Sequence, residues 1–299
     1  MLSKDPISTA MTPRSIAVPF LGGLLLFGAL TTLLIGAEDP SSADHFAQGE
    51  AAFQERADYE RMTEAIASYE AVLPSLETLP VQSQAFVLNR LAQLHYELTT
   101  FSPGDTPEDR DAFQKGKDYG LRSLRLHPGF AEWEDADFAK AVSFVTEPAA
   151  LLWTADNWGV LCNYNPIQGL LQIGKVRTLY ERCLAVDETY WGASAHNALG
   201  AILIVTPKVA GGDPEVGRTH LEWAIALSPD YLENRVVYAQ YWGFTYDFFG
   251  NVNGIRDRDF IEQQLNMVLQ DPVGDWPFWN HEAKKEAEEL LRKLREDSP

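Results

Sequence analysis

The stretch "GGDPEVGRTHLEWAIALSPDY", residues 211–231, contains the pattern that decides the fold. Its Asp-Pro pair predicts a helix start, because aspartate is a good N-cap and proline suits the first turn. In the helix that follows, Gly217, Leu221, Ala224 and Pro229 are spaced by four, three and five residues. Small residues at the first and third of these positions let a second helix approach closely, and proline ends the helix.

The same spacing occurs three more times, in sets that begin at residues 65, 116 and 176. These sets are Ala65, Tyr69, Val72 and Glu77; Gly116, Gly120, Ser123 and Pro128; and Val176, Tyr180, Cys183 and Glu188. A candidate partner helix precedes each of the four sets, around Gly49, Leu91-Ala92, Leu161-Cys162 and Leu199-Gly200. This arrangement is typical of tetratricopeptide repeats.

The four sets begin 51, 60 and 41 residues apart, whereas a regular tetratricopeptide array repeats every 34 residues or so. The sequence therefore predicts an all-α fold, a degenerate tetratricopeptide-like solenoid of helical hairpins with long loops. Alternating β-branched runs with hairpin turns are missing. Residues 199–205 could pass for a single buried strand.

The N-terminus predicts a separate membrane segment. Residues 16–37 carry no charge, and their length suffices to cross a bilayer as a helix. Basic residues precede this run and acidic ones follow, so residues 1–14 are expected in the cytoplasm and the remainder outside. Residues 15–37 are interpreted as a transmembrane anchor or a signal peptide. The anchor is favoured because the run is long and Ile35-Gly36-Ala37 is a poor cleavage triplet.

Residues 38–44 are expected to form a polar linker, and residues 45–299 a periplasmic helical domain. The formal net charge of −19 makes nucleic acid an unlikely partner. The two cysteines, Cys162 and Cys183, fit buried thiols or a disulfide in an oxidising compartment. His220 is interpreted as a residue of a helix face, because no second histidine lies near it in the sequence.

No motif predicts catalysis, a metal site or a cofactor. "GASAH", residues 192–196, is similar to the nucleophile elbow of hydrolases but lacks its last glycine and a preceding strand. The six histidines form no close pair in the sequence. "NVNGIRDRD", residues 251–259, does not have the spacing of a calcium-binding loop.

The second half of the chain resembles the T-component family of TRAP transporters. The segments that carry the resemblance are "LLWTADNWGVL", "VDETYWGASAHNALGAIL", "AGGDPEVGRTHLEWAIALSPDY" and "VVYAQYWGFTYDFFG" with its continuation to residue 272. The family order is represented by Trp153 and Trp158; Trp191, Gly192, His196, Leu199 and Gly200; Gly211, Gly212 and Asp213; Tyr238, Ala239 and Tyr241; and residues 257–260. The resemblance covers residues 145–295 well, and residues 43–140 only through the repeats.

TRAP transporters are tripartite, ATP-independent carriers that pair a periplasmic solute-binding protein with a membrane permease. The resemblance implies a non-catalytic periplasmic protein that docks the solute-binding protein and offers a cavity to an apolar or organic-acid ligand. The permease is a further expected partner, the N-terminal helix is expected to bind the inner membrane, and self-association is compatible with the family. Family members are often lipid-anchored, but this chain has no cysteine directly after its apolar run to accept a lipid.

Two readings of function stay open. The alternative to transport is a general tetratricopeptide scaffold for the assembly of envelope complexes. In either case, apolar ligand sites are lined by aromatic side chains with few polar groups. The candidate ligand- or pore-lining residues are Trp153, Trp158, Tyr190, Trp191, His196, Tyr238 and Tyr241.

Overall fold

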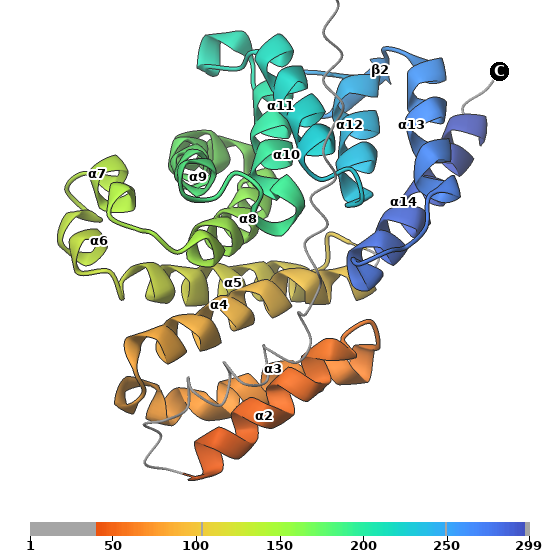
Figure 1. Cartoon of the computed structure of the whole chain (residues 1–299). Coiled ribbons are helices and arrows are strands. Elements are labelled where there is room, and N and C mark those ends of the chain that lie inside the picture. Colours follow the sequence, from red (N-terminus) through yellow and green to blue (C-terminus); the bar gives the residue numbers. More distant parts are fainter. Residues whose placement is uncertain (1–39, 103, 249, 297–299) are drawn as a thin grey trace, which may run out of the picture.

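The computed structural model describes residues 40–296 except residues 103 and 249 (Figure 1). The expected cytoplasmic segment 1–14 and the expected membrane segment 15–37 therefore lie outside the described residues. Within the described part of the chain, every helix is too short or too polar to span a bilayer.

The described residues are mostly helical, as predicted. The first helices are α2 (Pro40–Gln54), α3 (Tyr59–Val72), α4 (Val81–Leu98), α5 (Pro107–Leu124), α6 (Pro128–Trp133) and α7 (Phe138–Ser143). They are followed by α8 (Pro148–Tyr164), α9 (Pro166–Val186), α10 (Tyr190–Val205), α11 (Pro214–Leu227), α12 (Glu233–Gly243), α13 (Arg258–Gln270) and α14 (Pro277–Glu296). Three short 3-10 turns are η1 (Leu73–Thr78), η2 (Thr99–Phe101) and η3 (Lys208–Ala210).

The helix boundaries follow from local chemistry. Asp213 caps α11, because its side chain accepts a hydrogen bond from the Val216 backbone, and Pro214 occupies the first turn. Thr106 and Asp109 form a reciprocal capping box at the start of α5. The Asp-Pro signal in residues 211–231 therefore marks a true helix start.

The four predicted helix pairs form. Helices α2 and α3, α4 and α5, α8 and α9, and α10 and α11 each pack together. In Figure 1 the pairs follow one another in sequence order from α2–α3 at the bottom to α10–α11 at the top, and α14 runs along the right-hand side. The assignment of these hairpins to tetratricopeptide repeats stays a prediction.

Three expectations were wrong in detail. The segment 38–44 is not a linker throughout, because α2 begins at Pro40 and the buried hydroxyl of Ser42 bonds that of Ser75 at 2.7 Å. Residues 199–205 belong to α10 rather than to a strand. A small antiparallel hairpin, β1 (Phe244–Tyr246) and β2 (Val252–Ile255), was not foreseen, because its strands are too short to show an alternating pattern.

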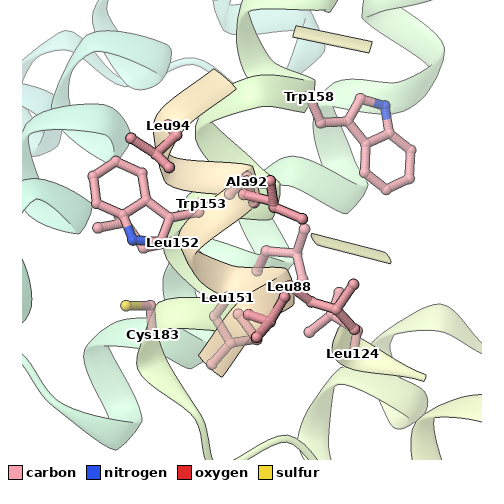
Figure 2. Packing of buried hydrophobic residues seen from close by; sticks show 14 of the residues in the cluster. Leu88, Ala92, Leu94, Leu124, Leu151, Leu152, Trp153, Trp158 and Cys183 are labelled. Carbon is pink, nitrogen blue, oxygen red and sulfur yellow. The ribbon is translucent and has the colours of Figure 1, made fainter. Parts of the chain in front are cut away.

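The main core lies where α4, α5 and α8 meet. Leu88 and Ala92 of α4, Leu124 of α5 and Leu151 of α8 are almost completely buried. Figure 2 shows these side chains close together, with Cys183 of α9 nearby. A second cluster holds α12, α13 and α14 together through side chains such as Val236, Ile261 and Ala287.

A buried ion pair ties the first hairpin to the last helix. The carboxylate of Glu97, fully buried at the end of α4, accepts hydrogen bonds from Arg56 at 2.6 Å and Gln93 at 2.8 Å. The indole N–H of Trp279 in α14 donates to the same carboxylate at 3.1 Å. The Arg56 guanidinium also lies 4.9 Å from the ring centroid of Phe278.

We expect Glu97→Ala to lower the free energy of unfolding by about 3 kcal/mol, because it leaves the Arg56 charge without its buried partner. The measurement is urea unfolding followed by circular dichroism. Glu64→Ala is the control: it removes an exposed ion pair with Arg61, and such pairs contribute little. Equal losses in the two variants would contradict a special role for Glu97.

Helices α10 and α11 depend on two facing glycines. A Cβ added at Gly217 would lie 2.7 Å from the backbone oxygen of Gly200, which cannot move away without moving the helix. A Cβ added at Gly174 in α9 would have no neighbour within 4 Å. The two positions are therefore a matched pair for the same substitution.

We expect Gly217→Ala to destabilise the protein by about 1–3 kcal/mol through overpacking. Gly174→Ala should stabilise it by up to about 1 kcal/mol, because alanine is the better helix former. Thermal and urea unfolding of both variants check this. Shifts of the same sign would show that the contact between α10 and α11 is looser than the distances indicate.

Candidate ligand-binding cavity

A cavity of about 1300 Å³ lies among the helices of the second half. Its walls come from α8, α9, α10, α12 and α14, with the β1–β2 hairpin at one side. Drug-sized ligand pockets are typically about 300–1,000 Å³. The cavity is therefore large enough for a small organic molecule or a lipid-like chain.

The cavity runs lengthwise along α14. Trp279, Glu286 and Lys293 line it at intervals of seven residues, which is about 10 Å per interval in a helix. Trp279 is 9% exposed and marks the inner end, whereas Lys293 is exposed and marks the outer end. The carboxyl group of Glu286 therefore stands midway along this wall.

A left-handed turn places Trp191 in the cavity wall. Trp191, Gly192 and Ala193 have φ angles of 49°, 67° and 61°, a conformation that only glycine adopts readily. A Cβ at Gly192 would lie 2.5 Å from the Tyr231 ring. The turn is held by Asn234, whose amide donates to the Gly192 carbonyl at 3.1 Å.

The turn brings several aromatic rings together. The indole of Trp191 lies edge-on to that of Trp153 at 5.1 Å and to that of Trp276 at 5.5 Å between centroids. Tyr231 contacts Trp276 at 4.8 Å. Strained backbone persists where the surrounding structure determines it, and such residues gather at functional sites.

Three carboxyl groups line the cavity: Asp156 in α8, Glu233 at the start of α12 and Glu286 in α14. Burial raises the pKa of Asp156 to about 7, although the Tyr180 hydroxyl donates to it at 2.7 Å and lowers the pKa in part. Burial raises the pKa of Glu233 well above its ordinary value, and the nearby carboxyl of Glu286 adds to this. Burial also raises the pKa of Glu286, against a hydrogen bond from Gln240.

Asn197 of α10 presents a polar atom that has no hydrogen-bond partner among the described residues. The Asn234 amide donates to three backbone carbonyls, so its oxygen must accept, and it does so from the Asn197 amide at 2.6 Å. This fixes the Asn197 orientation and leaves its side-chain oxygen buried without a hydrogen bond. The indole N–H of Trp191 is likewise buried and unpartnered within the described structure. Both residues line the cavity.

The structure brings three of the seven candidate residues to the cavity, namely Trp153, Trp191 and Tyr241. The other four lie elsewhere: the Trp158 indole donates to Gln172 at 2.5 Å, and the Tyr238 hydroxyl donates to Glu222 at 2.8 Å. Tyr190 packs at the edge of the main core, and His196 is buried beside α11. The position of an aromatic residue within a predicted tetratricopeptide repeat does not show whether its ring faces the cavity or packs against another helix.

His220 lies on a face of α11, as expected, but it has a histidine partner that its sequence neighbourhood does not show. Its Nδ1 lies 2.8 Å from Nδ1 of His196, whose Nε2 lies 3.1 Å from Glu188. Burial lowers the pKa of both histidines, that of His220 to about 4. The packing of α10 against α11 brings together His196 and His220, which are 24 positions apart in the sequence, so no local motif predicts their contact. In the described chain, no three potential His, Cys, Asp or Glu ligands converge on a metal position.

Two further side chains of interest have structural partners. The Ser194 hydroxyl donates to the Trp191 carbonyl at 2.6 Å, and both ring nitrogens of His196 already contact His220 and Glu188. Cys162 and Cys183 are both buried free thiols, and burial raises their pKa values to about 11 and about 12.

Sequence reasoning missed the carboxyl groups of the cavity. Asp156 gave a signal, because it is the single acid within the otherwise uncharged helix "PAALLWTADNWGVLCNY". Glu233 and Glu286 gave none: Glu233 stands in the first turn of α12, where an acid suits any helix start, and Glu286 lies in a helix with several other glutamates. Their burial depends on the packing of α12 against α14.

Asp156→Asn is expected to flatten the dependence of stability on pH. In the folded protein Asp156 keeps its proton up to about pH 7, whereas in the unfolded chain it loses the proton near pH 4. Between these values the folded state binds more protons, so this group makes stability fall as pH rises. The variant should therefore gain stability relative to wild type at pH 7 but not at pH 4.

Urea unfolding at pH 4, 5, 6 and 7 measures this difference. Asp187→Asn, a change at an exposed acid after α9, is the control. A difference between Asp156→Asn and wild type that stays constant over this range would contradict the raised pKa.

Comparison with known proteins identifies the family. No curated protein matches the chain. The sequence profile described as TRAP transporter T-component matches residues 83–296, which run from the first turn of α4 to the end of α14 and include every residue that lines the cavity. The order of motifs that carried the resemblance falls within this region. The chain therefore belongs to the TRAP transporter T-component family.

Proposed function

We propose that this protein is a non-catalytic periplasmic accessory component of a TRAP transporter, which docks the solute-binding protein and holds a ligand with an apolar body in its cavity. Family membership supports the role in transport. The observation that carries the ligand-holding role is the 1300 Å³ cavity lined by Trp153, Trp191 and Tyr241. Residues 15–37 would hold the protein at the inner membrane, with residues 1–14 in the cytoplasm.

The mouth of the cavity supports the docking role. Five apolar side chains that line the cavity are also strongly exposed; they form the apolar rim, which consists of Ile167, Leu170, Leu171, Phe248 and Val252. Ile167 is 78% exposed and Leu171 74%. Exposed apolar groups gathered around an opening are typical of an interaction surface.

A solute-binding protein seated on the apolar rim would remove these side chains from water. Burial of apolar surface contributes roughly 25 cal/mol per Å² to association. The same contact would cover the cavity mouth, so an apolar ligand could pass between the two proteins without crossing bulk water. The rim thus links docking and ligand holding in one place.

Co-purification tests the docking role. The full-length chain is used as bait in the envelope of its own host, and bound proteins are identified by mass spectrometry. We expect recovery of a TRAP solute-binding protein. The double variant Ile167→Asp/Leu171→Asp should lower that recovery at least ~10-fold, because two buried charges at an interface cost several kcal/mol.

Val81→Asp is the matched control, since Val81 is also exposed, at 54%, but lies at the start of α4 and does not line the cavity. It should leave recovery unchanged. Recovery of unrelated envelope proteins alone, while the solute-binding protein is present in the lysate, would favour the general assembly scaffold. Equal recovery with all three baits would place the docking surface away from the rim.

A further inference from the structure

The charges inside the cavity restrict the class of ligand. Its lining includes three carboxyl groups, those of Asp156, Glu233 and Glu286, and a single basic side chain, Lys293. Lys293 is exposed at the outer end, where its ammonium group lies 3.4 Å from Glu289, and its charge also lowers the pKa of Glu286 in part. The lining of the cavity is therefore mainly acidic, with one positive charge at its outer end.

Glu233 lacks a compensating group. Within the described residues no hydrogen-bond donor or cation is paired with its carboxyl group, and the charges that act on it are the carboxyl groups of Glu286 and Glu282, which raise its pKa further. Glu233 is half-buried, and an acid withdrawn from water without a partner costs free energy. A positively charged group placed between Glu233 and Glu286 would remove this cost.

The surrounding side chains suit an organic cation. The aromatic rings of Trp191, Tyr231 and Tyr241 line the same cavity, and aromatic faces attract ammonium groups. The unpartnered side-chain oxygen of Asn197, in a residue 6% exposed, offers a further acceptor for an N–H group. The unpartnered indole N–H of Trp191 offers one donor to an acceptor group, but among the described residues of the lining the single cation is Lys293 at the outer end.

We propose that the cavity binds an organic cation, an amine joined to an apolar body, with the ammonium group held between Glu233 and Glu286. This inference rests on the proposed ligand-holding role and narrows it, because it rejects the organic-acid class. The apolar body would extend along α14, toward Trp279 at the inner end or toward Leu290 and Leu294 at the mouth.

Binding is coupled to protons. Burial raises the pKa of both carboxyl groups and so favours their protonated forms. An ammonium group pairs with the ionised form, so its arrival displaces any proton that the carboxyl holds, and the buffer takes that proton up. Other ionisable groups around the site are Asp156, Tyr96, Tyr180, Tyr231, Tyr241, Glu282 and Lys293. The burial of the tyrosines raises their pKa values, so they stay neutral between pH 6 and pH 8.

The test compares three probes with one skeleton: 2-phenylethylamine, 2-phenylethanol and 3-phenylpropionate. Each is titrated into the full-length chain in phosphatidylcholine nanodiscs, with empty nanodiscs as the blank. Tryptophan fluorescence reports occupancy, because Trp153, Trp191 and Trp279 line the cavity. Calorimetry in buffers of different ionisation enthalpy reports protons released.

We expect the amine to bind at least ~10-fold more tightly than the alcohol, because a charge pair withdrawn from water is stronger than a neutral hydrogen bond. Its binding should be tighter at pH 8 than at pH 6 and should release protons. Glu233→Gln and Glu286→Gln should each remove this preference. Both substitutions keep the side-chain shape and remove a buried acid, so the fold should persist. Glu288→Gln, an exposed position two residues from Glu286, should leave binding unchanged.

The outcomes separate the two proposals. If the alcohol or the carboxylate binds as tightly as the amine, the cation inference is overturned while ligand holding stands. If the amine preference survives both Glu→Gln variants, the assignment of the ammonium position is wrong. If none of the three probes changes the fluorescence or the heat, the cavity binds no small amphiphile, and both the cation inference and the ligand-holding role are wrong. Docking to the solute-binding protein is tested separately by co-purification.

Discussion

The structure depends on the buried carboxylate of Glu97. It collects donors from three parts of the chain: Arg56 beyond the first helix, Gln93 one turn earlier in α4, and Trp279 at the start of α14, 182 residues away. Successive helical hairpins contact mainly their neighbours, so nothing in such packing alone fixes the last helix against the first hairpins. The carboxylate supplies that fixed point. Because α14 forms one wall of the cavity, this network also fixes one end of that wall.

Small residues and strained backbone shape the cavity around this fixed point. Gly200 and Gly217 bring α10 and α11 into backbone contact, which leaves the opposite face of α10 free to line the cavity. The left-handed turn at Trp191, Gly192 and Ala193 then aims one large ring inward at the start of the same helix. Apolar walls of this kind normally carry few polar groups. The three carboxyl groups and the unpartnered amide oxygen of Asn197 are therefore the features that distinguish this cavity from a packing gap.

The elements that could be predicted from the sequence are those whose cause is local. Asp213 and Pro214 define a helix start by themselves, and the spacing from Gly217 to Ala224 defines a close helix contact, so the helix pairs and the family resemblance followed. The residues of the candidate site could be predicted less well. Trp153 and Trp158 occupy one helix and look alike in sequence, yet only the first faces the cavity. The contact of His196 with His220, and the effect of Glu286 on the pKa of Glu233, arise from packing between helices. No local sequence pattern shows which residue of a helix a distant partner will cover.

Trp279 serves the core and the cavity with different parts of one side chain. Its indole N–H belongs to the Glu97 network, while its ring closes the inner end of the cavity. Substitution of Trp279 would disturb the fold regardless of its effect on ligand binding. The inner end of the cavity therefore has little freedom to change during evolution. Side chains at the opposite end, such as Ile167 and Leu171, support no comparable network and are mostly exposed. Homologous proteins that handle different ligands should therefore vary at the mouth and keep the inner end, and the same division indicates where selectivity could be redesigned without loss of the fold.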